Sequence, residues 1–152
     1  MSGQLKLSTR GEYGLRAMFE LARKYGEGPV SLRSIAEEQD ISENYLEQLI
    51  AVLRKSGLVE SVRGAQGGYM LAAAPQEINV GDIIRVLEGP IAPTDCVSEN
   101  SKTDCGRAGT CASRLIWEKV RDSITKVLDG FTLLDMVQEA EKMGNRQLRQ
   151  ET

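Results

Sequence analysis

The chain opens with apolar residues at intervals of three and four, a spacing that places them on one face of a helix. Thr9 and Glu12 fit a capping box at the start of this helix, with Thr9 as the N-cap and Glu12 at the third helical position. Gly26 and the Gly28-Pro29 pair end it. The apolar face of this predicted first helix comprises Gly14, Met18, Leu21, Ala22 and Tyr25.

The next two apolar patterns are short and lie close together. Residues 31–39 predict a second helix and residues 43–55 a third. Between them, Asp40 tolerates a left-handed backbone, Ile41 fills the gap between the helices and Ser42 caps the third helix. Such a turn, with polar side chains early on the following helix, is typical of a helix-turn-helix, although a structural helical hairpin has the same pattern. The buried stripe of the third helix comprises Leu46, Leu49, Ile50 and Leu53.

A hairpin pattern follows the third helix directly. Residues 58–63 predict a strand, residues 64–68 a glycine-rich turn and residues 69–71 the return strand. Arg63 begins the bare tip, where a cation suits a phosphate or a narrow minor groove, and Gly64 allows a close backbone approach. A hairpin that only covers the core does not explain this arginine. The pattern therefore favours a winged helix-turn-helix, in a fold that is mainly α with a small β-hairpin wing and a long dimerisation helix.

The second half of the chain predicts further helices. One spans residues 79–87, a long one spans residues 113–129, and a last, short helix opens at Thr132. We expect residues 144–152 to form a disordered tail because they are polar. The long helix carries an apolar stripe that a chain of this size has little core left to cover. The stripe is therefore a candidate dimer interface, and packing on the chain's own first helix is the alternative. It comprises Ile116, Val120, Ile124, Val127 and Phe131.

Composition and charge narrow the class of protein. The 152 residues are 41% hydrophobic and 27% charged, which is ordinary for a globular chain. The net charge of −3 argues against strong non-specific nucleic-acid binding, so DNA affinity has to rest on local clusters such as Arg54, Lys55 and Arg63. There is no membrane-spanning apolar run and no export signal, so we expect a cytoplasmic protein without a membrane partner. Without histidine or any recognisable catalytic motif, we expect no enzyme.

All three cysteines of the chain lie in one polar loop: Cys96, Cys105 and Cys111. Free cysteines usually prefer burial, so three together in a loop rich in Gly, Ser, Thr and Asp indicate a shared role. An iron–sulfur cluster, a zinc ion and a thiol–disulfide switch all use clustered thiols, and three incidental cysteines are the remaining alternative. Structural zinc prefers four Cys or His ligands in closely spaced pairs, which this chain lacks.

Three stretches of the chain carry a resemblance to a known family: KLSTRGEYGLRAM, ISENYLEQLIAVLRKSGLVESVRGAQGGYML and INVGDIIRVLEGPI. They resemble the winged-helix regulators that include IscR and CymR, over the chain from Leu5 to about Val137. The resemblance implies a homodimer, held by the long helix, with both wings on one palindromic double-stranded operator. It places Arg63 and Gly64 at the minor groove or backbone. It places the start of the third helix in the major groove, namely Ser42, Asn44, Tyr45, Glu47 and Gln48.

In this family the cysteine loop separates two branches. CymR-like members lack the cysteine triplet, whereas IscR-like members use three cysteines and a nearby histidine to bind a 2Fe-2S cluster. Here the histidine position is occupied by Arg114, which has no lone pair for iron. The cluster ligands implied by the resemblance are Cys96, Cys105 and Cys111. The candidates for the fourth ligand are Glu12 of the same or the partner subunit, Asp104, Asp95, Ser113, solvent and a small thiol.

We therefore expect a winged helix-turn-helix domain in residues 1–90 and a cysteine-rich, cluster-binding loop in residues 91–112. A dimerisation helix and a C-terminal helix follow in residues 113–143, before the tail. The predicted function is that of a repressor that senses iron–sulfur status through a 2Fe-2S cluster and controls iron–sulfur cluster assembly genes. The alternative is a repressor of cysteine or sulfur metabolism genes with redox-active or incidental cysteines.

Overall fold

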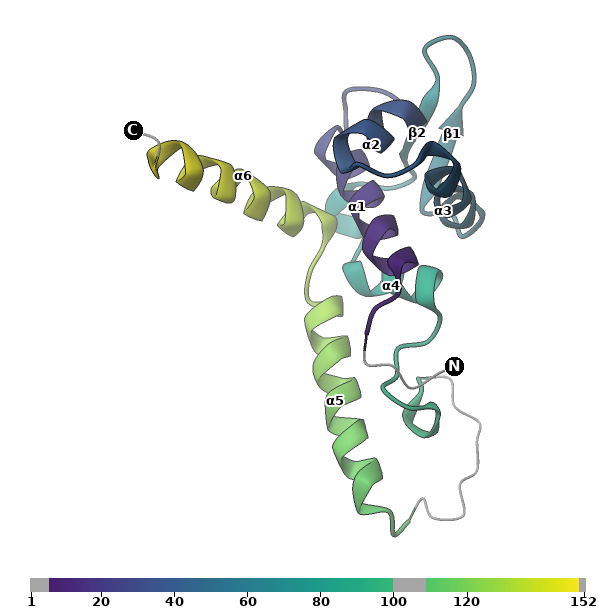
Figure 1. The fold of residues 1–152 in the computed structure, drawn as a ribbon, viewed down its shortest axis with the longest axis vertical. Helices are drawn as coiled ribbons and strands as arrows, with labels where there is room; N and C mark the ends of the chain where they lie inside the picture. The colour runs from purple at the N-terminus through teal and green to yellow at the C-terminus, as the bar shows by residue number, and fades with distance from the viewer. Residues whose placement is uncertain (1–5, 100–108, 151–152) are drawn as a thin grey trace.

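The computed structural model describes residues 6–99 and 109–150, and Figure 1 shows how their elements are arranged. The described part is mainly helical and contains one two-stranded antiparallel hairpin, which confirms the predicted fold class. The α-helices are α1 (Thr9–Arg23), α2 (Leu32–Gln39), α3 (Glu43–Lys55), α4 (Val80–Glu88), α5 (Ala112–Asp129) and α6 (Leu133–Gln150). The strands are β1 (Val59–Val62) and β2 (Gly68–Leu71), and short 3-10 turns are η1 (Pro75–Glu77) and η2 (Asp95–Val97).

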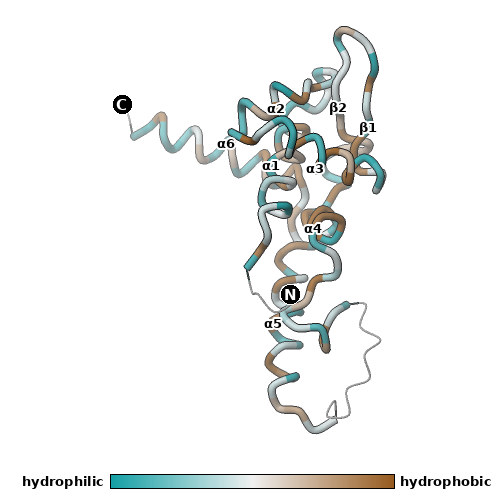
Figure 2. Tube along the Cα trace, turned by 45° about the vertical axis from the view of Figure 1, so that its right-hand side comes forward, coloured by the Kyte–Doolittle hydropathy of each residue, from teal (hydrophilic) through white to brown (hydrophobic). Residues whose placement is uncertain are grey.

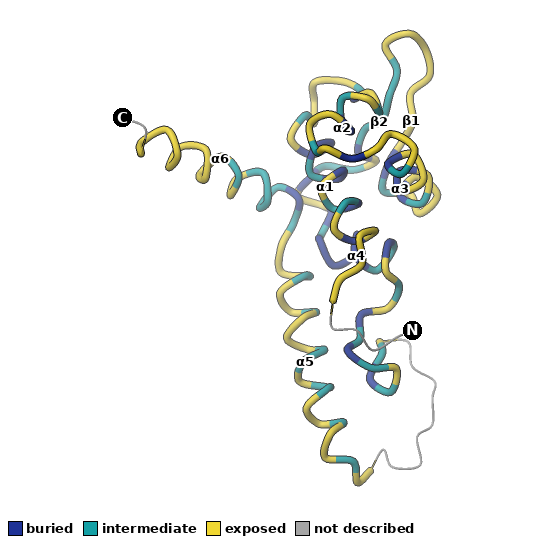
Figure 3. The backbone as a smooth tube through the Cα atoms, in the orientation of Figure 1, coloured by how far each residue is buried: buried dark blue, intermediate teal, exposed yellow. Residues whose placement is uncertain are grey.

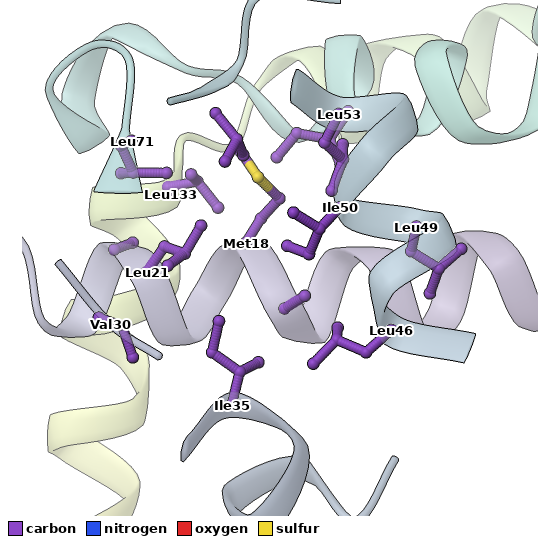
Figure 4. Packing of buried hydrophobic residues seen from close by; sticks show 14 of the residues in the cluster. Met18, Leu21, Val30, Ile35, Leu46, Leu49, Ile50, Leu53, Leu71 and Leu133 are labelled. Atoms are coloured by element: carbon purple, nitrogen blue, oxygen red, sulfur yellow. The ribbon is translucent and has the colours of Figure 1, made fainter. Parts of the chain in front are cut away.

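The hydrophobic core lies where α1, α2 and α3 meet. Figure 4 shows Met18 of α1 pointing between Ile50 and Leu53 of α3, with Ile35 of α2 approaching from another side. These side chains are at most 1% exposed. The predicted apolar faces of the first three helices are buried as expected, except that Tyr25 lies beyond the end of α1 and is 48% exposed.

The turn between α2 and α3 has the predicted form. Asp40 is left-handed, with φ 52° and ψ 52°, and it is the one residue other than glycine with positive φ in the described part of the chain. Ile41 is buried beneath the turn. The Ser42 hydroxyl caps α3 by accepting a hydrogen bond from the backbone N–H of Tyr45 at 3.2 Å. The helix-turn-helix is therefore set by local chemistry that the sequence already carries.

The hairpin is bonded to Val30, just before α2, as well as to itself. Its strands pair from Val59 with Leu71 to Val62 with Gly68. The backbone N–H groups of Val30 and Tyr69 each donate to the other's carbonyl at 2.8 Å. A Cβ on Gly68 would collide with the Val30 carbonyl, so this close approach requires glycine. The return strand of the wing is consequently bonded to the segment that leads into the helix-turn-helix.

The predicted capping box at the start of α1 is wrong. The N-cap is Ser8, and its side chain makes no capping hydrogen bond. The Glu88 carboxylate, from the end of α4, takes that role by accepting hydrogen bonds from the backbone N–H of Gly11 at 2.9 Å and from the Ser8 hydroxyl. Thr9 instead bonds to Tyr45 of α3. A tertiary contact has replaced the local cap, which leaves Glu12 exposed on the first turn of the helix.

Helix α6 begins where it was predicted to begin but continues beyond its predicted end. Its first residue, Leu133, is fully buried in the core of the winged part, beside Leu71 and Met18 (Figure 4). Its other end continues to Gln150, where a disordered tail from residue 144 was expected, and it projects away from the body (Figure 1). The reason is composition: Gln, Glu, Lys, Arg, Leu and Met dominate residues 138–150, and these strong helix formers outweigh one glycine.

Helix α5 has no buried residue along its whole length. Figure 3 shows it exposed or half-buried from end to end, and Figure 2 shows hydrophobic positions recurring along it. None of the described helices is long and apolar enough to cross a membrane. The large apolar side chains left exposed on α5 and in the turn before α6 are Leu115, Ile116, Ile124, Val127 and Phe131.

Candidate DNA interface and cysteine loop

The start of α3 presents four of the five predicted DNA-reading side chains to solvent. Ser42, Asn44, Glu47 and Gln48 are exposed. Tyr45 is half-buried instead: its ring packs edge-on against Tyr13, with ring centroids 6.0 Å apart. Its hydroxyl lies 3.1 Å from the Thr9 hydroxyl, in a hydrogen bond within the protein. Tyr45 therefore makes its contacts within the protein, whereas the other four side chains face the solvent.

The wing lies beside α3 and carries its cation, Arg63, at the tip. Arg63 and Gly64 are exposed there, and Gly64 has the positive φ of 113° that the turn needs. Arg54 of α3 donates to the Ser61 hydroxyl of β1 at 3.4 Å, which links helix to wing. A shallow hollow runs between α3 and β2, and it is lined by Glu47, Ile50, Ala51, Arg54, Lys55 and Tyr69.

An acidic side chain that the sequence analysis missed links α1 to the end of α2. Glu20 of α1 is 2% exposed, and its carboxylate accepts hydrogen bonds from Gln39 of α2 at 2.8 Å and from Arg23 at 3.1 Å. A buried carboxylate needs such partners because an unpaired one is costly. Gln39 immediately precedes the left-handed Asp40, so the contact fixes the end of α2 where the turn begins. Its place on the buried face of the first helix was the signal available in the sequence.

The first half of the cysteine loop is folded. Ile91 and Val97 are 7% and 1% exposed, and Cys96 between them is half-buried, with its sulfur 3.2 Å from the Thr94 hydroxyl. Arg121 of α5 donates to the Val97 carbonyl at 3.0 Å. The segment 91–99 is therefore anchored on α5 directly next to the first cysteine.

A cluster of ion pairs centred on Arg85 of α4 anchors the same segment a second time. The guanidinium lies 2.7 Å from Glu99 and 2.7 Å from Asp129 at the end of α5. Hydrogen bonds to Asp129 and Glu99 raise the pKa of Arg85, and bonding to Arg85 lowers the pKa of both carboxyl groups. A Cβ on Gly81 would collide with the Asp129 carboxylate, so glycine is needed for this approach. The sequence analysis placed none of these residues in the site.

The other predicted ligands lie apart or outside the described chain. Cys111 is half-buried at the N-cap of α5, while Cys105 and Asp104 fall outside the described residues. Arg114, at the histidine position, donates to Glu118 on the same helix at 3.1 Å. In residues 6–99 and 109–150, no three Cys, Asp or Glu side chains gather in a metal-binding arrangement. The remaining candidates, Glu12, Asp95 and Ser113, are all exposed.

Helix α3 is exposed, follows a tight turn and lies beside a wing with glycines at its tip, and both α3 and the wing carry cations. These features define a winged-helix DNA-binding protein. The family described as Rrf2, iron-dependent transcriptional regulators, matches residues 7–139. The chain belongs to this family, and it is a transcription regulator.

The chain is similar to characterised regulators along most of its length. It is 50% identical to the HTH-type transcriptional regulator CymR of Bacillus subtilis, over 87% of this chain and 89% of that protein. The solved structure of that CymR, the global cysteine regulator of B. subtilis, superposes with a TM-score of 0.75, covering 90% of this chain and 98% of that one. The structure of T. potens IscR has the same TM-score, with 57% identity over 91% of this chain and 90% of that one. Because these relatives are regulators, the prediction that the chain is not an enzyme is confirmed.

Proposed function

We propose that this Rrf2-family regulator is a cytoplasmic, homodimeric repressor that binds a 2Fe-2S cluster and controls iron–sulfur cluster assembly genes. The observation that carries the proposal is the architecture around the cysteines. Cys96 lies in a segment anchored on α4 and α5, and Cys111 stands where α5 begins. The similarity to T. potens IscR over 91% of the chain supports the same assignment.

The residues present fit a 2Fe-2S cluster by their chemistry. Thiolates are the usual ligands of such clusters, and Cys96, Cys105 and Cys111 would supply three of them. Among the described cysteines, Cys96 and Cys111 are both free thiols and half-buried. The occupancy of the site by a 2Fe-2S cluster would depend on the supply of iron and sulfide and on oxidation. The donor set thus suits a sensor whose loading changes with the state of the cell.

The fourth ligand is proposed to be Glu12, with Asp104 as the other candidate. Glu12 is supported because Glu88 has taken over the capping of α1, so the Glu12 carboxylate is exposed and has no capping role. A carboxylate oxygen can bind iron, whereas the guanidinium of Arg114 cannot and is already bonded to Glu118. Glu12 would come from the same or from the partner subunit.

The proposed reading of the operator follows from the exposed side chains. In the major groove, Asn44 and Gln48 would bond adenine, Glu47 would accept from the cytosine amino group, and Ser42 would contact either a base or a phosphate. At the wing tip, Arg63 would enter the adjacent minor groove, with Gly64 allowing the backbone close to the DNA. Glu47 repels phosphates, so it should select between operators more than it adds affinity.

A homodimer is proposed from the exposed stripe of α5. A monomer would leave Ile116 57% and Val127 60% exposed in one apolar row, which water disfavours. A two-fold axis through the paired α5 helices would bring two wings to two half-sites of one double-stranded operator. Because residues 91–99 are bonded to both α4 and α5, loading of the loop would alter the pose of α4 against the dimer helix.

The test is spectroscopy on anaerobically purified protein. We expect visible absorption, Mössbauer parameters of a 2Fe-2S cluster, and two iron and two sulfide ions per chain, as the cluster formula requires. Replacing Cys96, Cys105 and Cys111 with alanine should abolish the colour, while the control Ser123→Ala, at an exposed position of α5 outside the loop, should keep it. Glu12→Ala should make the cluster more labile and change the spectrum of one iron site. A coloured triple-alanine protein would contradict the ligand assignment.

The second candidate is a repressor of cysteine or sulfur metabolism genes. The 50% identity to B. subtilis CymR and the lack of any histidine both favour it. A colourless, iron-free protein that cannot be reconstituted would support this candidate. The cysteines would then be tested for disulfides by thiol labelling before and after oxidation.

A further inference from the structure

Helix α4 packs so closely on α1 that two positions of α1 at the contact have to be glycine. A Cβ on Gly14 would collide with the Leu87 side chain, and a Cβ on Gly11 would lie 2.6 Å from a Glu88 carboxylate oxygen. Leu87 is 2% exposed, in the same core as α1 and α3. Figure 1 shows the start of α1 lying against α4, at the end of the winged part nearest to residues 91–99. The end of α4 is therefore in rigid contact with the start of α1.

Glu88 adds a directional bond to this packing. Its carboxylate accepts from the backbone N–H of Gly11 at 2.9 Å and from the Ser8 hydroxyl. The first turn of a helix has unsatisfied N–H groups and the positive end of the helix dipole, so a carboxylate is favourable there. Neither Ser8 nor Thr9 caps α1 with its own side chain. The position of the first turn of α1 thus depends on Glu88.

The next residue along, Thr9, reaches the recognition helix. Its hydroxyl is hydrogen-bonded to the Tyr45 hydroxyl at 3.1 Å, and the Tyr45 ring packs edge-on against Tyr13, one turn further along α1. The Arg16 guanidinium lies over the Tyr13 ring, 5.3 Å from its centroid. Tyr45 sits in the first turn of α3, between the exposed Asn44 and Glu47.

We propose that Glu88 and Tyr45 are positioning residues for DNA reading. Glu88 holds the first turn of α1 on the end of α4, and the Thr9–Tyr45 hydroxyl pair holds the first turn of α3 on that turn of α1. In this arrangement the Tyr45 hydroxyl affects DNA affinity through its hydrogen bond to Thr9, and it does not contact a base. These bonds hold the exposed neighbours of Tyr45 in a fixed orientation toward the major groove. The fixed orientation matters because a shift of about 0.5–1 Å weakens a contact with a base.

This arrangement also connects the recognition helix to the cysteine loop, a consequence that rests on the proposed function. Arg85, one turn before Glu88 on α4, is bonded to Glu99 of the loop and to Asp129 of α5. A change in segment 91–99 would reach Tyr45 along Arg85, Glu88 and Thr9. The path consists of ion pairs, hydrogen bonds and packed helices. Replacing a single bonding residue removes its ion pair or hydrogen bond from the path.

The test uses metal-free protein and a duplex that the wild-type protein selects from a random pool, with a scrambled duplex of equal composition. Tyr45→Phe keeps the ring and removes the hydroxyl, and Thr9→Val removes its partner. We expect each to weaken binding of the selected duplex by about two- to ten-fold, the range of one hydrogen bond. The double variant should be no weaker than either single variant. Tyr25→Phe, on an exposed tyrosine, is the matched control and should bind normally.

Three outcomes would overturn the assignment of Tyr45. A loss with Tyr45→Phe but not with Thr9→Val would mean that the hydroxyl touches DNA. Additive losses in the double variant would mean that the two residues act separately. Unchanged affinity with a lowered melting temperature would mean that the pair only stabilises the fold.

Glu88 is tested in the same assay by Glu88→Gln, with Glu77→Gln as the control for an exposed acid. We expect Glu88→Gln to weaken binding to the selected duplex more than to the scrambled one, and Glu77→Gln to change neither. Equal weakening on both duplexes would overturn the role. If wild-type protein takes up a cluster, Glu88→Gln should also reduce the difference in affinity between loaded and metal-free protein. Absence of a cluster would contradict the proposed function alone, because the metal-free assay does not depend on it.

Discussion

The winged part of the molecule and helix α5 use apolar residues in opposite ways. In the winged part they point inward: Leu53 of α3 is fully buried, and it packs against α1 (Figure 4). On α5 a stripe with the same helical spacing points outward, so that Val127 is 60% exposed and no residue of the helix is buried. The same periodicity has therefore produced a core in one region and a bare surface in the other. The difference is that other helices of the same chain cover the apolar faces in the winged part, whereas they leave the stripe on α5 exposed.

This comparison indicates which interactions belong to folding and which belong to assembly. The winged part gains its stability from contacts within one chain, and its core includes Leu133 from the far end of the sequence. Helix α5 packs on α4 and η2 of its own chain and is bonded to them at Arg121 and Asp129. In the proposed dimer, a second copy would cover the exposed apolar side chains of α5. The two regions should consequently respond differently to substitution.

The largest effect is expected from the core. Leu53→Ala should lower the free energy of unfolding by about 2–5 kcal/mol, because a fully buried leucine leaves a cavity. Ile116→Ala on α5, at 57% exposure, should change the unfolding of the monomer by less than about 0.5 kcal/mol. Urea denaturation at several protein concentrations measures both. Equal losses at low concentration would mean that the α5 stripe is covered within its own chain.

The next effect concerns assembly. Val127→Glu should place a charge in the proposed dimer interface and convert the dimer to a monomer. Operator affinity should then fall by about 100-fold or more, because the two wings no longer bind as one unit. Gln138→Glu, at an exposed position of α6, adds the same single negative charge outside α5 and is the matched control. Sedimentation and DNA binding report the two quantities, and a dimeric, fully active Val127→Glu protein would refute the assignment of α5.

The smallest effect is the pH dependence of the Arg85 cluster. The pKa values of Glu99 and Asp129 are lowered in the folded protein from ordinary values of 4.5 and 3.8, so their stabilising contribution is present above those values. It is lost as the pH falls through the lowered folded values. Arg85 stays charged throughout, because its own pKa is raised. Denaturation between pH 7 and pH 3 should show a decline that Arg85→Gln reduces, and an unchanged slope in that variant would contradict it.

Much of the winged part was predictable because its determinants are local. Asp40, Ser42 and the glycines of the wing act within a few residues, so their turn and cap chemistry can be read along the chain. The exposed Asn44, Glu47 and Gln48 were likewise correctly placed on the outer face of α3. The capping of α1 was predicted wrongly because its partner, Glu88, is 77 residues from Gly11. The ligation by Cys96, Cys105 and Cys111 and the role of Glu12 stay predictions.

The sequence by itself determined the helices, the wing and the identity of the chemistry-bearing side chains, because propensity, periodicity and turn residues operate over short distances. Only the tertiary structure decided which of those side chains are used. It turned Tyr45 inward onto Thr9, gathered Glu99 and Asp129 around Arg85, and placed Leu133 in the core while leaving α5 bare. These outcomes depend on which surfaces meet when the chain folds, and contacts between distant residues are not encoded in local spacing.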